Sequence, residues 1–346
     1  MAVPVYRKVH LEILRIVAVL FVIFNHTDGY YLYYSNTSNP LTWLFSVLGS
    51  VICRTNVPLF LMITGALLLD RKETVKEIYR KRVFRIAVVL FIFSAFYYGV
   101  SIIRHKNTGY SVMDFLMGFL EGSVQESFWY LYLYLGILML LPFFRKLVQS
   151  LEDREFGYLI LLQLFWSVGV PIAGKATGVE ISSYLYQVNI YFFYVMAGYF
   201  LEVRIPAEKV TGRHIAAMIG CISFGLAVAV GIIAWDYFRS GKYDPFCIGI
   251  LTPVFSLGIF FCIRWIFTGY FLPRRAEALV LYIGNCVFGI YLLEQLARIQ
   301  LLPLYLYLTE KTVGIFACTC YVIGGFSLAL LYTVVLKHVP GIRKLL

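Results

Sequence analysis

The chain has 346 residues, of which 60% are hydrophobic, 18% aromatic and only 14% charged. With a mean hydropathy of +0.78, this composition excludes a soluble globular protein and indicates a polytopic membrane protein. The formal net charge of +11 needs no nucleic-acid partner, because membrane proteins collect Lys and Arg in their cytoplasmic loops.

Apolar stretches long enough to cross about 30 Å of hydrocarbon predict an all-α fold with ten transmembrane helices. We place them near residues 11–30, 42–69, 83–103, 128–145, 156–173, 182–201, 214–235, 247–268, 279–302 and 313–336. With the N-terminus inside, 21 Lys and Arg residues fall on the cytoplasmic side and seven outside, and Arg15 and Arg54 lie within helices. This bias predicts that both termini are cytoplasmic. We expect a single transmembrane domain over residues 1–346, with no cleaved signal and no appended soluble domain.

The first predicted span carries Arg15 and His26 in the stretch LEILRIVAVLFVIFNHTDGY. Eleven helical steps end roughly 20° past three full turns and rise about 16 Å, so both side chains share one face. A cation inside a membrane helix costs about 2.5–3.5 kcal/mol on insertion scales and points to a functional site. Glu12, one turn before Arg15, is placed to pair with it. The alternatives are that Arg15 only reaches the cytoplasmic headgroups and that His26 only hydrogen-bonds a neighbouring helix.

The second predicted span is long and interrupted, with Arg54, Asn56 and Pro58 in the middle of its apolar sequence. Proline inside a helix removes a backbone hydrogen bond, so we expect a kink and a freed carbonyl near Arg54. Such a break is tolerated at membrane depth where it faces protein or a water-filled cavity, which makes Arg54 a candidate substrate-lining residue. The alternative is a purely structural ion pair between Arg54 and a carboxylate of another helix.

The third predicted span begins within the basic run RKETVKEIYRKRVFRI at residues 71–86, which carries Arg82 and Arg85 near its end. These two arginines are three residues apart and project from the same side of a helix. Guanidinium groups bind phosphates bidentately, so the pair is a candidate phosphate site. The alternative is that the positive-inside rule alone explains the basic loop.

Three of these features resemble motifs of the acyltransferase-3 family of integral membrane O-acyltransferases. An Arg and a His separated by ten residues in the first span resemble the opening motif of that family, and the Arg-x-x-Arg pair resembles another of its motifs. The stretch VPLFLMITGALLL at residues 57–69 is similar to its second-span signature, with Thr64 where Ser is common.

Two later stretches add to the resemblance. SFWYLYLYLGILMLLPFFRKL at residues 127–147 resembles the Trp-containing fourth-span motif, although Trp129 also fits an aromatic belt at the outer interface. FGIYLLEQL at residues 288–296 resembles a span that often reads Tyr-Leu-x-His, but Glu294 stands here where His is frequent. In a cavity, Glu294 would either orient His26 or neutralise Arg54.

The resemblance implies an enzyme that transfers a short acyl group, commonly acetyl, from cytosolic acyl-CoA to a hydroxyl of an extracytoplasmic glycan or other cell-surface molecule. Acyl-CoA is then a donor co-substrate, and we expect no permanently bound cofactor and no metal site. The expected surroundings are the lipid bilayer of a bacterial plasma membrane, with no nucleic acid as a partner.

These considerations assign roles to eight residues. His26 is the expected general base, because a neutral imidazole is available at pH 7. Arg15 is its electrostatic partner on the same helix face and a further contact for the donor. Arg82 and Arg85 are expected to bind the phosphates of acyl-CoA. The weaker candidates for a substrate contact or a supporting role are Arg54, Glu294, Trp129 and Glu12.

Two other classes of protein fit parts of the sequence. A secondary transporter, exporter or flippase of a glycan or small polar substrate would also use broken spans and buried charges. A membrane scaffold would leave Arg15, His26 and Arg54 unexplained. Only the enzyme should release free coenzyme A from acetyl-CoA.

Overall fold

The structure is a computed structural model that describes residues 8–27, 39–104, 111–179, 190–206, 209–241, 249–269 and 272–346. These residues form helices and loops without a strand, which confirms the predicted all-α class. They divide into two compact units. The first comprises Met1–Leu67, Glu152–Lys344 and Leu346, and the second comprises Leu68–Leu151 and Leu345.

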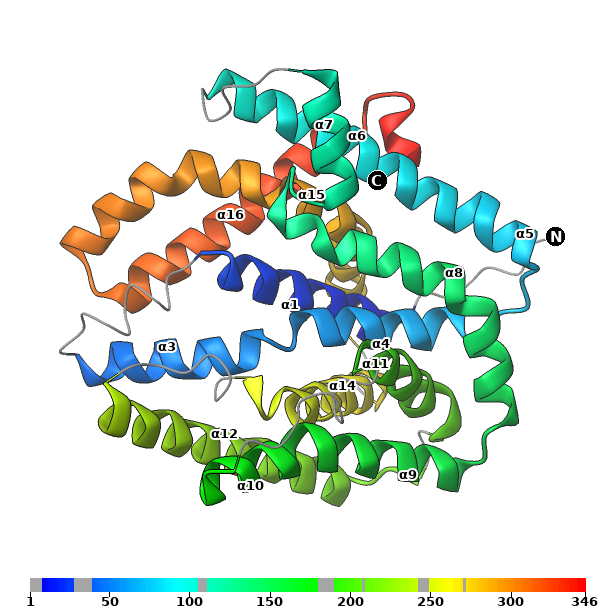
Figure 1. Ribbon diagram of the computed structural model, residues 1–346, viewed down its shortest axis with the longest axis vertical. Helices are drawn as coiled ribbons and strands as arrows, with labels where there is room; N and C mark the ends of the chain where they lie inside the picture. Colours follow the sequence, from blue (N-terminus) through cyan, green and yellow to red (C-terminus); the bar gives the residue numbers. More distant parts are fainter. Residues whose placement is uncertain are drawn as a thin grey trace. The chain divides into compact units, whose positions relative to one another are not determined.

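The first unit is built from the first helices of the chain and from the helices that follow residue 152 (Figure 1). They are α1 (Val9–Asn25), α3 (Pro40–Cys53), α4 (Asn56–Leu68), α9 (Asp153–Leu164), η3 (Phe165–Gly169), α10 (Val170–Thr177), α11 (Ile190–Tyr199), η5 (Phe200–Arg204), α12 (Gly212–Ser240), α14 (Thr252–Gly269), α15 (Arg274–Lys311), α16 (Gly314–Leu336) and η7 (Ile342–Lys344).

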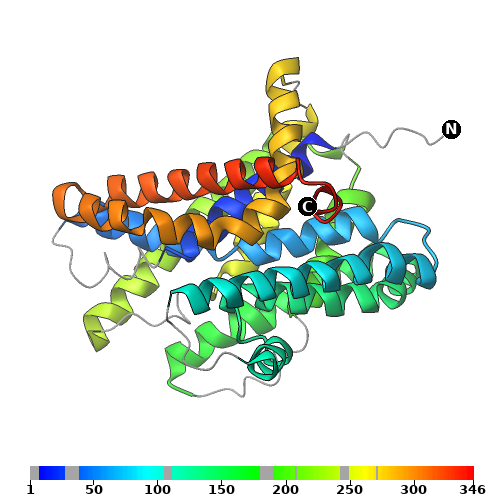
Figure 2. The ribbon, with the colours of Figure 1, turned by 90° about the horizontal axis from the view of Figure 1, so that it is seen from above.

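Helix α1 lies at the centre of the first unit. It packs against α3, α14, α15 and α16, and its residues Leu14, Ala18, Val19 and Ile23 have no exposed surface. Helices α15 and α16 run side by side as a long hairpin in both views (Figures 1 and 2). Among the polar residues of α1, His10 and Glu12 are buried by this packing, whereas Arg15 and Asn25 keep part of their surface exposed.

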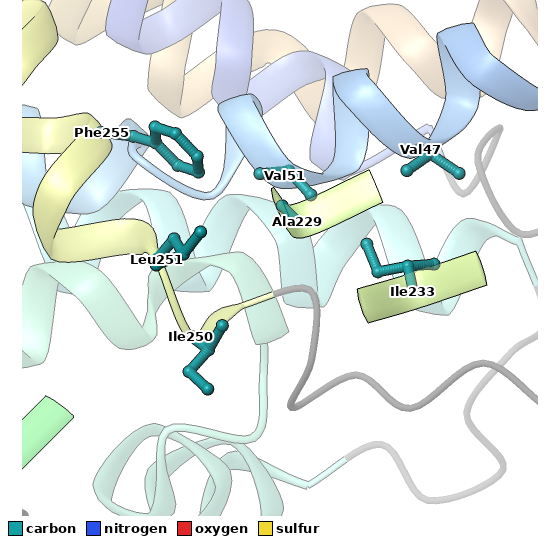
Figure 3. Close-up of a cluster of buried hydrophobic side chains, with 7 residues drawn as sticks. All are labelled: Val47, Val51, Ala229, Ile233, Ile250, Leu251 and Phe255. Atoms are coloured by element: carbon teal, nitrogen blue, oxygen red, sulfur yellow. The ribbon is translucent and has the colours of Figure 1, made fainter. Parts of the chain in front are cut away.

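One apolar cluster joins three parts of the first unit (Figure 3). Val47 and Val51 come from α3, Ala229 and Ile233 from α12, and Ile250, Leu251 and Phe255 from the start of α14 and the residues before it. Removal of such side chains from water contributes roughly 25 cal/mol per Å² to folding. Where lipid would otherwise cover them, van der Waals packing between the helices takes over this role.

Helices α4 and α11 approach each other at two glycines. A Cβ atom added to Gly65 would lie 1.8 Å from the carbonyl oxygen of Val195, and one added to Gly198 would lie 2.0 Å from that of Met62. Small residues allow membrane helices to make this kind of backbone contact. No larger side chain fits at either position without moving one of the helices.

The predicted interruption of the second span is confirmed. Helix α3 ends at Cys53 and α4 begins at Asn56, so Arg54 and Thr55 lie between two helical segments. Pro58, in the first turn of α4, has no N–H to donate to the carbonyl of Arg54. The regular hydrogen bonds resume with Leu59, whose N–H bonds to the carbonyl of Thr55 at 2.9 Å.

The second unit contains α5 (Val75–Ile78), the π-helical segment η1 (Tyr79–Val83), α6 (Phe84–Ile103), α7 (Val112–Glu121), η2 (Glu126–Phe128) and α8 (Trp129–Ser150). The sequence did not predict α7, which is too short to span a membrane. Its Phe115 and Phe119 pack against Phe91 of α6, and Phe119 also contacts Tyr132 of α8. Aromatic contacts thus hold this short helix on two longer ones.

Among the described residues, seven helices are long and apolar enough to cross a membrane: Pro40–Leu68, Val75–Ile103, Glu126–Ser150, Asp153–Gly174, Gly212–Arg239, Arg274–Lys311 and Gly314–Leu336. The other three predicted spans correspond to shorter helices. Helix α1 has 17 residues, and the predicted spans at 182–201 and 247–268 begin in residues that lie outside the described ranges. The count of ten spans and the cytoplasmic location of both termini therefore remain predictions.

Candidate functional site

His26 lies at the C-terminal end of α1 and contacts a buried carboxylate. Its Nδ1 atom is 2.8 Å from Oε1 of Glu294, which α15 contributes and which is 0% exposed. The His26 side chain keeps 26% of its surface exposed. A carboxylate only accepts hydrogen bonds, so Nδ1 is the donor in this contact, and in a neutral imidazole Nε2 is then the nitrogen with the lone pair. The contact therefore favours the tautomer in which Nε2 can act as a base.

Arg298 completes this group from one helical turn further along α15. Its Nε donates to Oε2 of Glu294 at 2.6 Å, and its Nη1 donates to the backbone carbonyl of His26. The guanidinium therefore bonds to Glu294 and to the residue that Glu294 holds. Arg298 lies inside α15, and 16% of its side chain is exposed.

The break in the second span lies beside the end of α1. The side chain of Asn25 donates a hydrogen bond to the carbonyl of Cys53 at 3.0 Å, immediately before Arg54. The Arg54 guanidinium lies against Gly249, where an added Cβ would be 3.6 Å from Nη1. Within the described part of the chain, Glu294 pairs with His26 and Arg298 rather than with Arg54.

Glu12 and Arg15 form the pair that their spacing predicts. Nη1 of Arg15 lies 3.0 and 3.1 Å from the two carboxylate oxygens of Glu12. Glu12 is buried against α15 at Gly284, where an added Cβ would lie 2.3 Å from its Oε2. Arg15 keeps 31% of its side chain exposed. The buried carboxylate thus binds one nitrogen of the Arg15 guanidinium, and part of the side chain stays accessible.

Helices α1 and α15 run parallel, with a polar group towards each end of their contact. Glu12 meets Gly284 and, further along both helices, His26 meets Glu294. Helical geometry puts Arg15 and His26 about 16 Å apart along α1. The two partly accessible side chains therefore mark the two ends of one helix face.

A third charged group, which the sequence analysis did not single out, lies at the start of α1. Glu202 accepts hydrogen bonds from Lys8 at 2.7 Å and from His10 at 3.1 Å, and Arg264 of α14 lies 3.0 Å from it. Arg264 also donates to the carbonyls of Leu201, Glu202 and Ile205. These contacts to Glu202 link α1 to η5 and α14. The partners lie far apart in the sequence, so residue spacing does not reveal them.

In the second unit, Arg82 is held by a carboxylate. Its Nε and Nη2 donate to the two oxygens of Glu73 at 3.2 and 2.7 Å, and Arg145 donates to the same carboxylate at 2.8 Å. Burial by itself raises the pKa of Glu73, but the two arginines outweigh it and lower the pKa to about 2. Arg85 instead donates two hydrogen bonds to the carbonyl of Leu345. The structure gives the two arginines different partners.

Trp129 opens α8 and is 44% exposed. Its ring contacts Tyr130 edge-on, and Tyr130 stacks on Tyr134 with ring centres 5.9 Å apart. This arrangement fits an interfacial aromatic belt as well as a substrate contact.

The comparison with known families decides the class. The model of the acyltransferase-3 family, described as an acyltransferase domain, matches residues 9–338, nearly the whole chain. The chain belongs to the acyltransferase-3 family. No curated protein and no solved structure matches it.

This acyltransferase-3 protein brings some of its predicted site residues together and leaves others apart. His26 and Glu294 meet directly, as do Glu12 and Arg15. Arg298 is the neighbour that the sequence analysis missed. The available signal was its position four residues after Glu294, because that spacing places an Arg and a carboxylate on one helix face.

Proposed function

We propose that the protein is an O-acyltransferase that moves a short acyl group, acetyl in the first instance, from cytosolic acyl-CoA to a hydroxyl of an extracytoplasmic glycan or other cell-surface molecule. Family membership supports the acyltransferase class. The observation that carries the proposal is the contact between Nδ1 of His26 and the buried Glu294, which leaves a partly exposed imidazole with Nε2 as an acceptor.

In the proposed reaction, Nε2 of His26 takes the proton from the acceptor hydroxyl as that oxygen attacks the thioester carbonyl. The tetrahedral intermediate then collapses, the carbon–sulfur bond breaks, and the coenzyme A thiolate leaves. The proton returns from His26 to the thiolate. The acceptor gains the acyl group, and the histidine ends in its starting state without a covalent intermediate.

Arg15 supplies positive charge to the same helix face. Its contact with Glu12 fixes the direction of the guanidinium while leaving 31% of the side chain exposed. This partly accessible cation lies about 16 Å along α1 from His26, so it can contact a donor that extends along the helix face towards the base. We therefore assign Arg15 to the donor and to the electrostatics of this face, and we assign a weaker substrate contact to Arg54.

Arg82 and Arg85 are the proposed ligands of the donor's phosphates in the second unit. A guanidinium binds a carboxylate and a phosphate with the same bidentate geometry, and Arg82 already holds Glu73 in this way. Acyl-CoA is a co-substrate in this proposal, not a resident cofactor. The proposed location is the bacterial plasma membrane, with Trp129 as a weaker candidate contact for the acceptor.

The test is release of free thiol from acetyl-CoA by the purified protein reconstituted in lipid vesicles. A cell-envelope glycan extract serves as acceptor, and vesicles without protein and reactions without extract are the controls. The proposal predicts thiol release that requires both protein and extract, with the acetyl group recovered on the glycan. Glycan movement across the vesicle membrane without thiol release, over a series of short acyl-CoAs, would instead establish the transporter alternative.

A further inference from the structure

Arg298 lies inside a long helix, well away from either end of it, and most of its side chain is buried against protein. Helix α15 continues to Lys311, and 16% of the Arg298 side chain is exposed. Its guanidinium donates hydrogen bonds to Glu294 and to the backbone of His26, the two residues of the proposed site. Burial of a charged group costs free energy unless the group is paired and hydrogen-bonded, so these contacts must offset the desolvation of Arg298.

The two hydrogen bonds of Arg298 reach His26 by different routes. The first goes to Oε2 of Glu294, whose other oxygen holds the imidazole, and therefore acts on the ring. The second goes to the backbone carbonyl of His26. Because α1 ends at Asn25, this carbonyl lies in the last turn, where a helix offers no N–H partner. One planar guanidinium thus restrains both the backbone and the ring.

Arg298 is itself held from the far side. The hydroxyl of Tyr321 on α16 donates to the backbone carbonyl of Arg298 at 2.9 Å. The Tyr321 ring stacks on Tyr305 with ring centres 4.2 Å apart and an angle of 9° between the rings. The hairpin of α15 and α16 therefore fixes the backbone of Arg298, and the Arg298 side chain in turn bonds to His26 and Glu294.

We propose that Arg298 is a positioning residue for acyl transfer, which fixes His26 through Glu294 and through the His26 carbonyl at once. This inference rests on the proposed function, because it assumes that His26 is the base. Neutralisation of Glu294 alone would need only a positive charge, whereas two-point positioning needs the two separated donors of a guanidinium.

The deciding variant is Arg298→Lys, which keeps the charge but replaces the fork by a single ammonium group. We expect kcat for acetyl transfer to fall at least ten-fold while KM for acetyl-CoA stays within two-fold, because ground-state donor binding does not involve this residue. Arg298→Ala should lose more activity, and added guanidinium ion should restore part of it. Arg275→Lys, an exposed arginine near the start of the same helix, is the matched control and should keep its kcat.

Wild-type kcat in Arg298→Lys would overturn two-point positioning, and so would equal losses of kcat and donor affinity. If Arg298→Ala does not fold, the lysine variant still decides. His26→Ala is assayed alongside to separate the two proposals. An active His26→Ala enzyme refutes the proposed base and this inference with it, whereas an inactive His26→Ala with a fully active Arg298→Lys refutes only the role of Arg298.

Discussion

The imidazole of His26 has one nitrogen for proton transfer because the other is committed to Glu294. The carboxylate fixes both the ring orientation and the tautomer, and neither effect requires it to touch a substrate. A neutral amide of the same shape does not impose the same tautomer, since it both donates and accepts hydrogen bonds.

Glu294→Gln should therefore lower kcat by about 10²-fold, within the range that general acid–base catalysis contributes, and leave donor affinity unchanged. Steady-state kinetics of acetyl transfer measures both quantities. Glu310→Gln, at an exposed position near the end of the same helix, is the control and should behave as wild type. A Glu294→Gln enzyme with undiminished kcat would show that the carboxylate does not position the base.

Arg82 and Arg85 carry the donor-binding part of the proposal. The double variant Arg82→Ala with Arg85→Ala should weaken acetyl-CoA binding by about ten-fold or more, because each charge-assisted bond to a phosphate is worth roughly 1.5–3 kcal/mol. Equilibrium binding to reconstituted protein gives the dissociation constant. Arg80→Ala, an exposed arginine of the same run, is the comparison. Unchanged affinity in the double variant would refute the phosphate site.

Glu73 makes the stability of the protein depend on pH. Its pKa falls from an ordinary value of 4.5 to about 2 because Arg82 and Arg145 favour the charged form over the opposing effect of burial. A lowered pKa in the folded state stabilises the fold above pH 4.5, and this contribution disappears as the pH falls towards 2.

Thermal unfolding in detergent at pH 7 and at pH 3 tests this linkage. Glu73→Gln should unfold at a lower temperature than wild type at pH 7, and the difference should shrink at pH 3. Asp70→Asn, an exposed carboxylate nearby, should shift neither value appreciably. A difference between Glu73→Gln and wild type that does not change with pH would contradict the ion-pair explanation.

At the scale of helices, close packing depends on a few glycines. Gly198→Ala places a methyl group 2.0 Å from the carbonyl oxygen of Met62, so α4 and α11 must separate. Overpacking of this kind costs about 1–3 kcal/mol or more. At Gly220 of α12, no atom of the described residues lies within 4 Å of an added Cβ. Alanine there should be neutral or stabilising, since it restricts the unfolded chain. Equal melting temperatures for the two variants would show that the α4–α11 contact is not tight.

The sequence predicts helices better than it predicts where they end. The break at Arg54 follows from Pro58 and is confirmed, because the missing N–H acts locally. Helix α15 extends past the expected end at residue 302 to Lys311, with Pro303 inside it. Helix α7 was missed because hydropathy detects spans, whereas aromatic contacts with α6 and α8 hold this shorter segment.

Most of the site contacts that residue spacing does not predict join residues far apart in the sequence. The Glu12–Arg15 pair was predictable because both residues lie one turn apart on one helix. His26 with Glu294 was one of two open alternatives, and the structure selects it over a pair with Arg54. Arg264, which lies inside the predicted span at 247–268, is buried and bonded to Glu202 and its neighbours. No one-dimensional pattern connects residues so far apart in the chain.

At the scale of the whole molecule, the family match covers residues of both compact units. The single transmembrane domain, ten spans and cytoplasmic termini remain predictions of the sequence. The parallel course of α1 and α15 agrees with that topology, since the first and ninth of ten spans cross in the same direction. The proposed base and the proposed phosphate ligands lie in different units, so each role needs its own variant.

The most direct measurement compares acceptor-dependent acetyl transfer by the wild-type protein, His26→Ala and His338→Ala, all reconstituted in the same lipid. His338 is exposed and serves as the matched histidine control. We predict that His26→Ala lowers kcat by about 10²–10⁴-fold, the usual contribution of a general base, while His338→Ala retains wild-type turnover. A His26→Ala protein that keeps a tenth or more of wild-type turnover would contradict the assignment of His26 as the base.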